Sequence, residues 1–261
     1  MKSKAFKLIS AILSVLFWIL VWAAISFKVS NAFLLPSPAD TLRALWGMAV
    51  SADFWTTAGI SLARILAGIL IAVAIGSATA ILTANLYAAD SLLSPMMTVI
   101  KATPVASFIV LALLWIDRNT LPVFITVLIV LPIVWSNVSS GIRAVDKGLL
   151  DVARVYRFPL GKRIMRVYVP SVTPYFLAAC RASLGMAWKA GIAAEVLCTP
   201  RHAIGTQIYF SKTYLETTDL FAWTLAVIIL SVIIEKLLIL SLERLAGRLH
   251  VSRSEARDDK A

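Results

Sequence analysis

The sequence predicts an all-α membrane protein with six transmembrane helices, because its composition is apolar and its uncharged stretches are long. Of its 261 residues, 60% are hydrophobic and 15% are charged, whereas soluble domains carry about 25% charged residues. A helix needs about 20 apolar residues to cross a bilayer, and residues 8–27, 65–89 and 119–142 reach that length without a charged side chain. The net charge of +11 then fits basic residues collected on one side of a membrane better than a nucleic-acid-binding protein.

Three further stretches are apolar but carry embedded charges. Residues 8–27, the stretch nearest the N-terminus, are expected to remain as a span, because their apolar run is longer than the hydrophobic region of a cleavable signal peptide. The spans form a single transmembrane domain over residues 1–249, followed by a short charged cytoplasmic tail over residues 250–261. The predicted spans cover about residues 8–27, 56–84, 91–116, 120–140, 171–197 and 220–242.

The distribution of basic residues orients these spans. If the N-terminus lies inside, the cytoplasmic segments hold fifteen of the 25 lysines and arginines, the external loops hold five and the spans hold five. Lysine and arginine are enriched in cytoplasmic loops. We therefore expect a multi-pass membrane protein with both termini in the cytoplasm.

Two local patterns predict how helices begin and pack. Ser37 is a good N-cap for a short amphipathic helix at the outer interface, with Pro38 at its first position. Every fourth residue along one side of the second span is small, which would let another helix approach closely. The alternative interpretation is a glycine-rich helix that makes no special contact. The apolar stripe of the short helix is Leu42, Leu45, Trp46, Ala49 and Val50, and the row of small residues is Gly68, Ala72, Gly76 and Ala80.

Charged residues inside the predicted spans are candidates for a translocation path or gate. Charges at such depth are costly and usually face a partner or a water-filled path. Structural pairing between helices is the alternative, and it is favoured for Arg64 and Lys236. An excess of basic over acidic residues favours an anionic solute. The path or gate candidates are Lys101, Arg181, Lys189 and Glu195.

The loop over residues 143–168 is the one long basic interruption between apolar stretches. Asp146 can cap a first short helix, and Pro159 should turn the chain before a second. Such a hairpin could bury its apolar stripes against the spans and present Arg154, Arg157, Lys162 and Arg163 outward. A solvated basic loop held by anionic lipid head groups is an equally weighted alternative. The predicted stripes are Leu149, Ala153 and Tyr156, with Val152 beside them, and then Leu160, Ile164, Val167 and Tyr168.

This loop resembles the "EAA" coupling loop of ATP-binding-cassette importer permeases. Asp151-Val152-Ala153 stand at the Glu-Ala-Ala positions, Arg157 stands at the family glycine, and Val167-Tyr168-Val169-Pro170 stand at Ile-x-Leu-Pro with the spacing intact. Because a side chain replaces the glycine, the backbone at Arg157 is expected to adopt a conformation that a side chain allows. Segments that resemble the nitrate/sulfonate/taurine branch include Leu35-Pro36-Ser37-Pro38, Ser61-Leu62-Ala63-Arg64, Arg181-Ala182-Ser183-Leu184-Gly185 and Ala194-Glu195-Val196-Leu197.

The resemblance implies the type I importer permease (MetI-like) fold in the inner (cytoplasmic) membrane of a prokaryote. It also implies a homodimer of permeases, two cytoplasmic ATP-binding subunits and an external solute-binding protein. Nitrate, alkanesulfonates, bicarbonate and thiamine-pyrimidine precursors are all carried by similar systems, so the solute stays open. The residues expected to couple to the ATPase are Asp151, Ala153, Arg154, Tyr156, Arg157 and Gly161.

We expect no catalytic site, no cofactor and no metal in this chain. Gly161-Lys162 lacks the upstream glycine and the following hydroxyl residue of a phosphate-binding loop. His202 and His250 are isolated, and no cysteine cluster has metal-ligand spacing. A stand-alone secondary transporter or channel is the alternative function, but no inverted repeat supports it.

Overall fold

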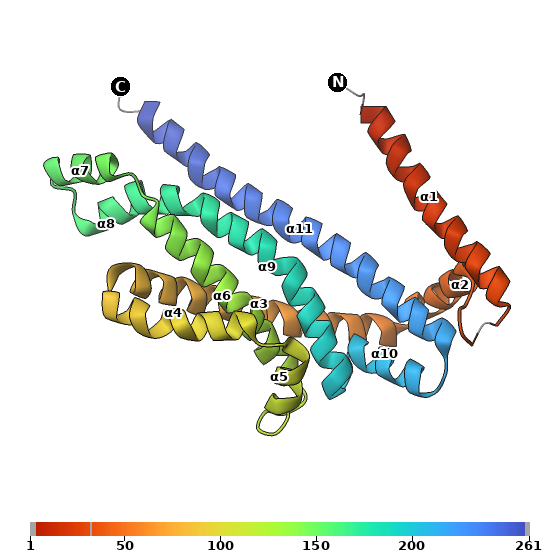
Figure 1. Cartoon of the computed structure of the whole chain (residues 1–261). Coiled ribbons are helices and arrows are strands. Elements are labelled where there is room, and N and C mark those ends of the chain that lie inside the picture. The colour runs from red at the N-terminus through yellow and green to blue at the C-terminus, as the bar shows by residue number, and fades with distance from the viewer. Residues whose placement is uncertain (1–3, 32, 259–261) are drawn as a thin grey trace.

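The chain folds into helices throughout the part that the computed structural model describes, residues 4–31 and 33–258. The long helices α1, α3, α6, α9 and α11 overlap five of the predicted spans, and shorter helices lie at the two ends of the bundle (Figure 1). The helices are α1 (Lys4–Val29), α2 (Pro38–Ala49), α3 (Ala52–Asn85), α4 (Tyr87–Ala102), α5 (Val105–Ala112), α6 (Leu121–Arg143), α7 (Lys147–Val155), α8 (Leu160–Arg163), the π-helical turn η1 (Ile164–Tyr168), α9 (Val169–Cys198), α10 (Ile204–Thr213) and α11 (Thr217–Asp258).

Helices α3, α6 and α9 form the centre of the fold. The predicted row of small residues on α3 is confirmed as a close contact with α6: a Cβ at Gly68 would lie 2.6 Å from Thr126 Cβ, and one at Gly76 would lie 3.0 Å from Val134 Cβ. Ala72 and Ala80, the other members of the row, are fully buried. Small side chains therefore bring the two backbones together, and dispersion contacts stabilise the pair in a bilayer.

The predicted third span, residues 91–116, is wrong as a single helix. Its apolar stretch forms α4 and α5, which are bent by 102° relative to one another. The break falls at Thr103 and Pro104, because proline restricts the preceding residue to extended backbone and cannot donate a helical hydrogen bond. Pro132 and Pro174, in contrast, lie inside α6 and α9 without ending them.

The number of spans is only partly settled by helix length and hydropathy. Helices α1, α3, α6 and the Thr217–Leu242 part of α11 are long and apolar enough to cross a membrane, and α4 with α5 qualifies as one broken span. Helix α9 is 30 residues long, which gives about 45 Å of helix, but its three charged residues lower its hydropathy. The sixth span therefore remains a prediction that rests on the length of α9.

The first and last of the long helices, α1 and α11, meet at the end of the bundle where α2 lies. Ser37 caps α2 as predicted, since its Oγ accepts a hydrogen bond from Asp40 N at 3.1 Å. Helix α1 lies apart from the bundle (Figure 1) and meets it near its C-terminal end, where Trp22 stacks on Phe221 at 5.8 Å between ring centroids. Helix α11 continues to Asp258, and so into the predicted tail, of which residues 259–261 lie outside the described part.

Candidate coupling face and translocation surface

The basic loop is an ordered hairpin, and its first helix has defined ends. Asp146 caps α7 as predicted, with its Oδ1 accepting a hydrogen bond from Gly148 N at 2.7 Å. At the other end Arg157 has a left-handed φ of 48°. Phe158 N donates to Ala153 O at 2.9 Å and Arg157 N donates to Arg154 O at 3.0 Å. These two bonds are those of a Schellman motif, whose left-handed position glycine usually occupies.

The expectation that Arg157 would take a backbone conformation suited to a side chain is therefore wrong. The hairpin keeps the geometry of a glycine turn although an arginine stands there. A left-handed residue other than glycine costs roughly 1–2 kcal/mol. The two hydrogen bonds of the motif and the packing of Phe158 beneath α7 offset this cost.

The apolar faces of the hairpin differ from the predicted stripes. Ala153 is only 2% exposed and packs with Val145 and Val167. Tyr156 is 73% exposed, because the reversal at Arg157 brings Phe158, rather than Tyr156, under the hairpin. Leu149, Val152, Leu160 and Ile164, placed in or beside the predicted stripes, are exposed as well.

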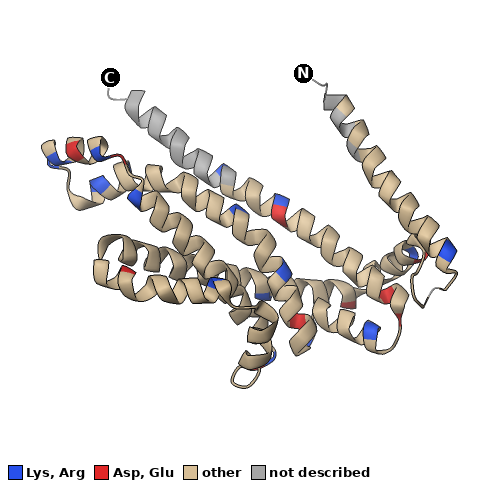
Figure 2. Ribbon diagram, viewed as in Figure 1, with Lys and Arg blue, Asp and Glu red and all other residues tan. Residues whose placement is uncertain are grey.

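The outward face of α7 therefore combines apolar and charged side chains. Arg154 pairs with Asp151 at 3.2 Å, and both side chains are mostly exposed. Lys162 lies over the Phe158 ring at 4.5 Å, while Gly161 is exposed and has open space around it. Arg163 is the exception to the predicted outward basic face, because its Nε is buried. Figure 2 shows the basic residues gathered on α7 and α8 and only scattered along the long helices.

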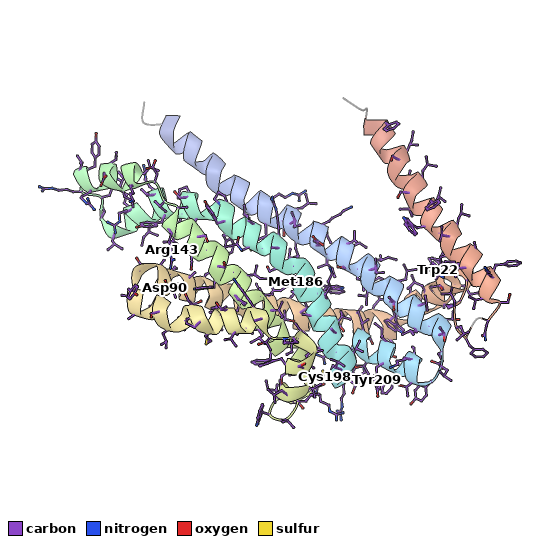
Figure 3. The ribbon with its side chains drawn as sticks, viewed as in Figure 1. Trp22, Asp90, Arg143, Met186, Cys198 and Tyr209 are labelled. Atoms are coloured by element: carbon purple, nitrogen blue, oxygen red, sulfur yellow. The ribbon has the colours of Figure 1, made fainter. Side chains whose placement is uncertain are left out.

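An ion pair that the sequence analysis missed joins this hairpin region to α4. Arg143 Nη2 lies 2.9 Å from Asp90 Oδ2 (Figure 3), and Ser94 donates to the other carboxylate oxygen at 2.9 Å. The two partners stand at the C-terminal end of α6 and in the first turn of α4. They hold the start of the broken span against the helix that leads into α7.

Glu195, the acidic candidate for the path or gate, lies fully buried inside the protomer. Its Oε2 accepts hydrogen bonds from Ser61 Oγ at 2.9 Å and from Gly205 N at 3.2 Å. Arg64 Nη1 lies 3.7 Å from Oε1, and Arg64 Nη2 donates to Arg201 O at 2.8 Å. Three elements, α3, α9 and the start of α10, are thus joined at one carboxylate, and the expected structural pairing of Arg64 is observed.

Close backbone contacts surround this carboxylate. A Cβ at Gly205 would overlap Glu195 and would lie 2.5 Å from Val196 N, and one at Gly191 would lie 2.6 Å from Ile65 Cγ1. The connection between α9 and α10 reverses through two left-handed residues, Thr199 and His202. Arg64 binds the carbonyls of this connection, so the loop and the buried acid depend on the same guanidinium.

The basic candidates lie on outer faces instead. Arg181 and Lys189 are exposed on α9, and Lys189 shares its side of the helix with exposed Met186, as the helical spacing of three residues requires. Lys101 is exposed at the last residue of α4 and lies 5.7 Å from the centroid of the Trp135 ring. The structure therefore separates the four candidates, with Glu195 inside the protomer and the three cations outside.

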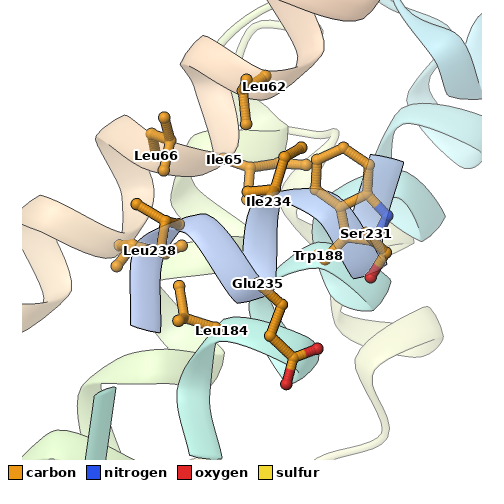
Figure 4. Close-up of a pocket in the computed structure, with 10 residues that line it drawn as sticks. Leu62, Ile65, Leu66, Leu184, Trp188, Ser231, Ile234, Glu235 and Leu238 are labelled. Atoms are coloured by element: carbon orange, nitrogen blue, oxygen red, sulfur yellow. The ribbon is translucent and has the colours of Figure 1, made fainter. Parts of the chain in front are cut away.

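A small cavity lies between α3, α9 and α11 (Figure 4). Its volume is about 10 Å³, which holds at most one water molecule. Glu235 directs its carboxylate away from the Ile65 and Trp188 side chains of this cavity (Figure 4). This cavity is therefore too small to pass a solute.

No metal site is found among the described residues, since no three of their histidine, cysteine and acidic side chains cluster. Cys180 and Cys198 are both free and buried. Cys198, labelled in Figure 3, donates from Sγ to Arg118 O at 3.5 Å, which ties the end of α9 to the loop before α6.

A buried three-helix centre, a broken third span and an ordered basic hairpin between α6 and α9 define a membrane permease. The family "Binding-protein-dependent transport system inner membrane component" matches residues 72–251. That range covers more than half of the chain, and the chain belongs to this family.

Individual relatives agree with the family. The chain is 28% identical over 207 residues to the putative aliphatic sulfonates transport permease protein SsuC of Bacillus subtilis, covering 78% of this chain and 74% of that protein. It is 30% identical over 159 residues to the bicarbonate transport system permease protein CmpB of Synechococcus elongatus, covering 60% of this chain and 56% of that protein. A crystal structure of an amino acid ABC transporter with histidines shares the fold, with a TM-score of 0.53 at 17% identity over 75% of this chain and 90% of the other.

The chain is therefore a transmembrane permease subunit of an ATP-driven, binding-protein-dependent importer, with the MetI-like fold. This result decides between the importer and the stand-alone secondary transporter that the sequence left as an alternative. It also places the chain in the inner membrane as a multi-pass protein that works with ATP-binding subunits and a solute-binding protein. Permeases of this family carry no catalytic site of their own.

Proposed function

We propose that two identical copies of this chain form a path for a small anionic solute between them. The observation that carries the proposal is Lys189 on the exposed face of α9, among Ala182, Met186 and Ala193. A lysine at the centre of a lipid-facing helix costs about 2.5–3.5 kcal/mol. A water-filled path shared with a second copy would remove that cost, and small neighbours let such a copy approach closely.

Electrostatics supports an anionic solute. Lys101, Arg181 and Lys189 are exposed, while the acidic candidate Glu195 is already bound inside the protomer. We propose that the three cations attract the solute and that Glu195 supports the outer gate from behind. The relatives named for aliphatic sulfonates and bicarbonate transport agree with an anion, and a nitrate/sulfonate/taurine-like solute fits the same charge.

The test is uptake into proteoliposomes that hold the permease with its ATP-binding subunits and solute-binding protein. The probes are nitrate, an alkanesulfonate and bicarbonate. Lys189→Gln should lower uptake of the transported anion about tenfold or more, because losing about 1.4 kcal/mol of attraction between the lysine and the anion corresponds to a factor of ten. Lys28→Gln is the control, because Lys28 is exposed at the end of α1. Equal uptake by the two variants at normal assembly would refute the role of Lys189, and preference for a neutral solute would refute the anion.

Coupling is proposed to run through α7. Its exposed face would dock on two ATP-binding subunits, one for each permease copy, and these subunits would hydrolyse the ATP. Asp151, Arg154, Tyr156 and Arg157 are exposed and available for contact. Gly161 is exposed in the following turn, while buried Ala153 would hold α7 in place rather than face the partner.

The arrangement of the helices supports cytoplasmic termini. The first turns of α1, the C-terminal part of α11 and helix α7 lie toward the same end of the molecule (Figure 1). If α7 meets cytoplasmic subunits, both ends of the chain lie on that side. The basic residues gathered on α7 and α8 agree with this orientation (Figure 2).

A further inference from the structure

A groove lies beneath the coupling hairpin, between α3, α6, the α8–η1 segment and α9. Its volume is about 560 Å³, within the range of about 300–1,000 Å³ that is usual for ligand pockets. It is distinct from the exposed face of α9 that carries Lys189. Its lining is Ser77, Ile81, Asn85, Val138, Ile142, Leu160, Arg163, Ile164, Tyr168, Val169, Val172, Thr173 and Phe176.

Two polar atoms of the groove lining lack a hydrogen-bond partner. Arg163 Nε and Ser77 Oγ are both buried and unsatisfied within the described part of the chain. No carboxylate of the described residues lies within ion-pair distance of Arg163. Buried polar atoms nearly always have partners, and the Nε of half-buried Arg163 belongs to a charged group, for which a partner matters most. An anionic group in the groove could accept a hydrogen bond from Arg163 Nε.

The rest of the lining is mostly apolar, with Asn85, Tyr168 and Thr173 as its other polar members. Ile81, Val138 and Ile142 face the groove from α3 and α6, and Val172 and Phe176 face it from α9. An occupant must therefore join an anionic group to a hydrocarbon chain. A free inorganic anion would satisfy Arg163 but would leave this apolar surface unmatched.

We propose that the groove holds an anionic phospholipid, with its phosphate at Arg163 and one acyl chain along the apolar wall. Anionic lipids are enriched in the cytoplasmic leaflet, and basic pockets between helices on that side bind their head groups. Lys162, exposed beside Arg163, adds to the local positive charge. The leaflet rests on the orientation proposed above, whereas the binding of lipid can be measured without any transport.

The position of the groove gives the lipid a role in coupling. Ile164 and Tyr168 of the π-helical turn line the groove, and Val167 between them packs against Ala153 of α7. A bound lipid would therefore fill the space between this turn and the ends of α3 and α6. It would hold α7 at a fixed distance from the bundle, which a coupling element requires.

The test counts lipids bound to the assembled importer by native mass spectrometry. The importer is equilibrated in nanodiscs of mixed phosphatidylglycerol and phosphatidylcholine and then released into detergent. Arg163→Gln should lower retained phosphatidylglycerol about tenfold or more, because a charge-assisted hydrogen bond and an ion pair are lost. Arg166→Gln is the matched control, since it removes the same charge three residues away from an exposed position outside the groove lining.

A second variant tests the hydrocarbon part with the charge intact. Ile81→Trp adds bulk at a side chain that is 55% exposed and lines the groove, so it should expel the lipid without disturbing the core. Equal phosphatidylglycerol retention by Arg163→Gln and Arg166→Gln would overturn the proposal. So would retention of phosphatidylcholine at the same level as phosphatidylglycerol, or full retention by Ile81→Trp.

Discussion

The end of the permease that holds α10 depends on the absence of a side chain at Gly205. The first turn of α10 lies against the backbone of α9 at Glu195 and Val196, where an added Cβ would overlap. The same glycine donates its N–H to the buried carboxylate of Glu195. A larger residue would therefore move the donor away and force the two helices apart at once.

Gly205→Ala should destabilise the permease by about 1–3 kcal/mol, the usual cost of overpacking. Gly47→Ala is the control, because Gly47 lies in α2 with open space around its Cα. Alanine at this position should increase the free energy of unfolding by about 0.5–1 kcal/mol. Thermal unfolding of the purified permease in detergent measures both. If Gly205→Ala unfolded at the same temperature as the wild type, α10 would be able to shift without loss of stability, and the prediction would be wrong.

Arg157 offers a test of backbone strain at a single position. Arg157→Gly should stabilise the end of α7 by about 1 kcal/mol, because glycine adopts the left-handed conformation without the side-chain penalty. Arg154→Gly, inside the same helix, should destabilise it by about 0.5–1 kcal/mol. Hydrogen exchange of the α7 amides reports this local stability. Faster exchange in Arg157→Gly than in the wild type would contradict the strain.

Among the elements, α7 shows what the sequence can and cannot predict. Its N-cap and its place in a hairpin follow from Asp146 and Pro159, which act locally. The buried face of α7 could not be predicted. The left-handed residue that turns Phe158 inward is Arg157, whereas glycine is the residue that usually indicates such a turn. The caps and the small-residue row on α3 were predictable for the same reason. The 102° bend between α4 and α5 was not, because Pro132 and Pro174 lie inside helices that continue, so a proline alone does not tell which helix will break.

The Glu195 cluster marks the same limit. Ser61 and Arg64 are three residues apart and share a face of α3, which the sequence can show. The hydrogen bond from Ser61 to Glu195 joins residues that are 134 positions apart in the sequence. The hydrogen bond from Gly205 to Glu195 depends on where α10 packs, which the sequence does not show. The sequence could therefore identify Glu195 as unusual but could not predict its burial.

The exposed face of α7 should control assembly with the ATP-binding subunits. Asp151→Lys and Tyr156→Ala should each lower co-purification of these subunits about tenfold or more, because hot-spot residues at interfaces contribute 2 kcal/mol or more. Both side chains are exposed, so the permease itself should fold normally. Lys212→Glu, exposed on α10 at the opposite end of the molecule, is the control. If all three variants co-purified with the ATP-binding subunits as well as the wild type does, α7 would not be part of the interface.

For the whole molecule, the proposed orientation can be tested by labelling. Both native thiols are buried, so an introduced cysteine can be detected over a low background. Lys147→Cys in α7 should be protected from an impermeant maleimide in intact cells and labelled after the membrane is opened. Lys212→Cys in α10 should be labelled in intact cells, since α10 lies at the outer end of the bundle. The reverse pattern would invert the topology.

The isolation of α1 has a consequence for how this sequence can change over time. Residues 12–20 are all exposed within the protomer, and the contacts described for α1 lie near its C-terminal end, at Trp22 and Ser26. Side chains that face only lipid are constrained by apolarity and length rather than by the shape of a neighbour. We expect α1 to drift faster than α3, α6 or α9, and the family match begins only at residue 72. Two lineages of this permease should therefore be hardest to align in their first membrane segment.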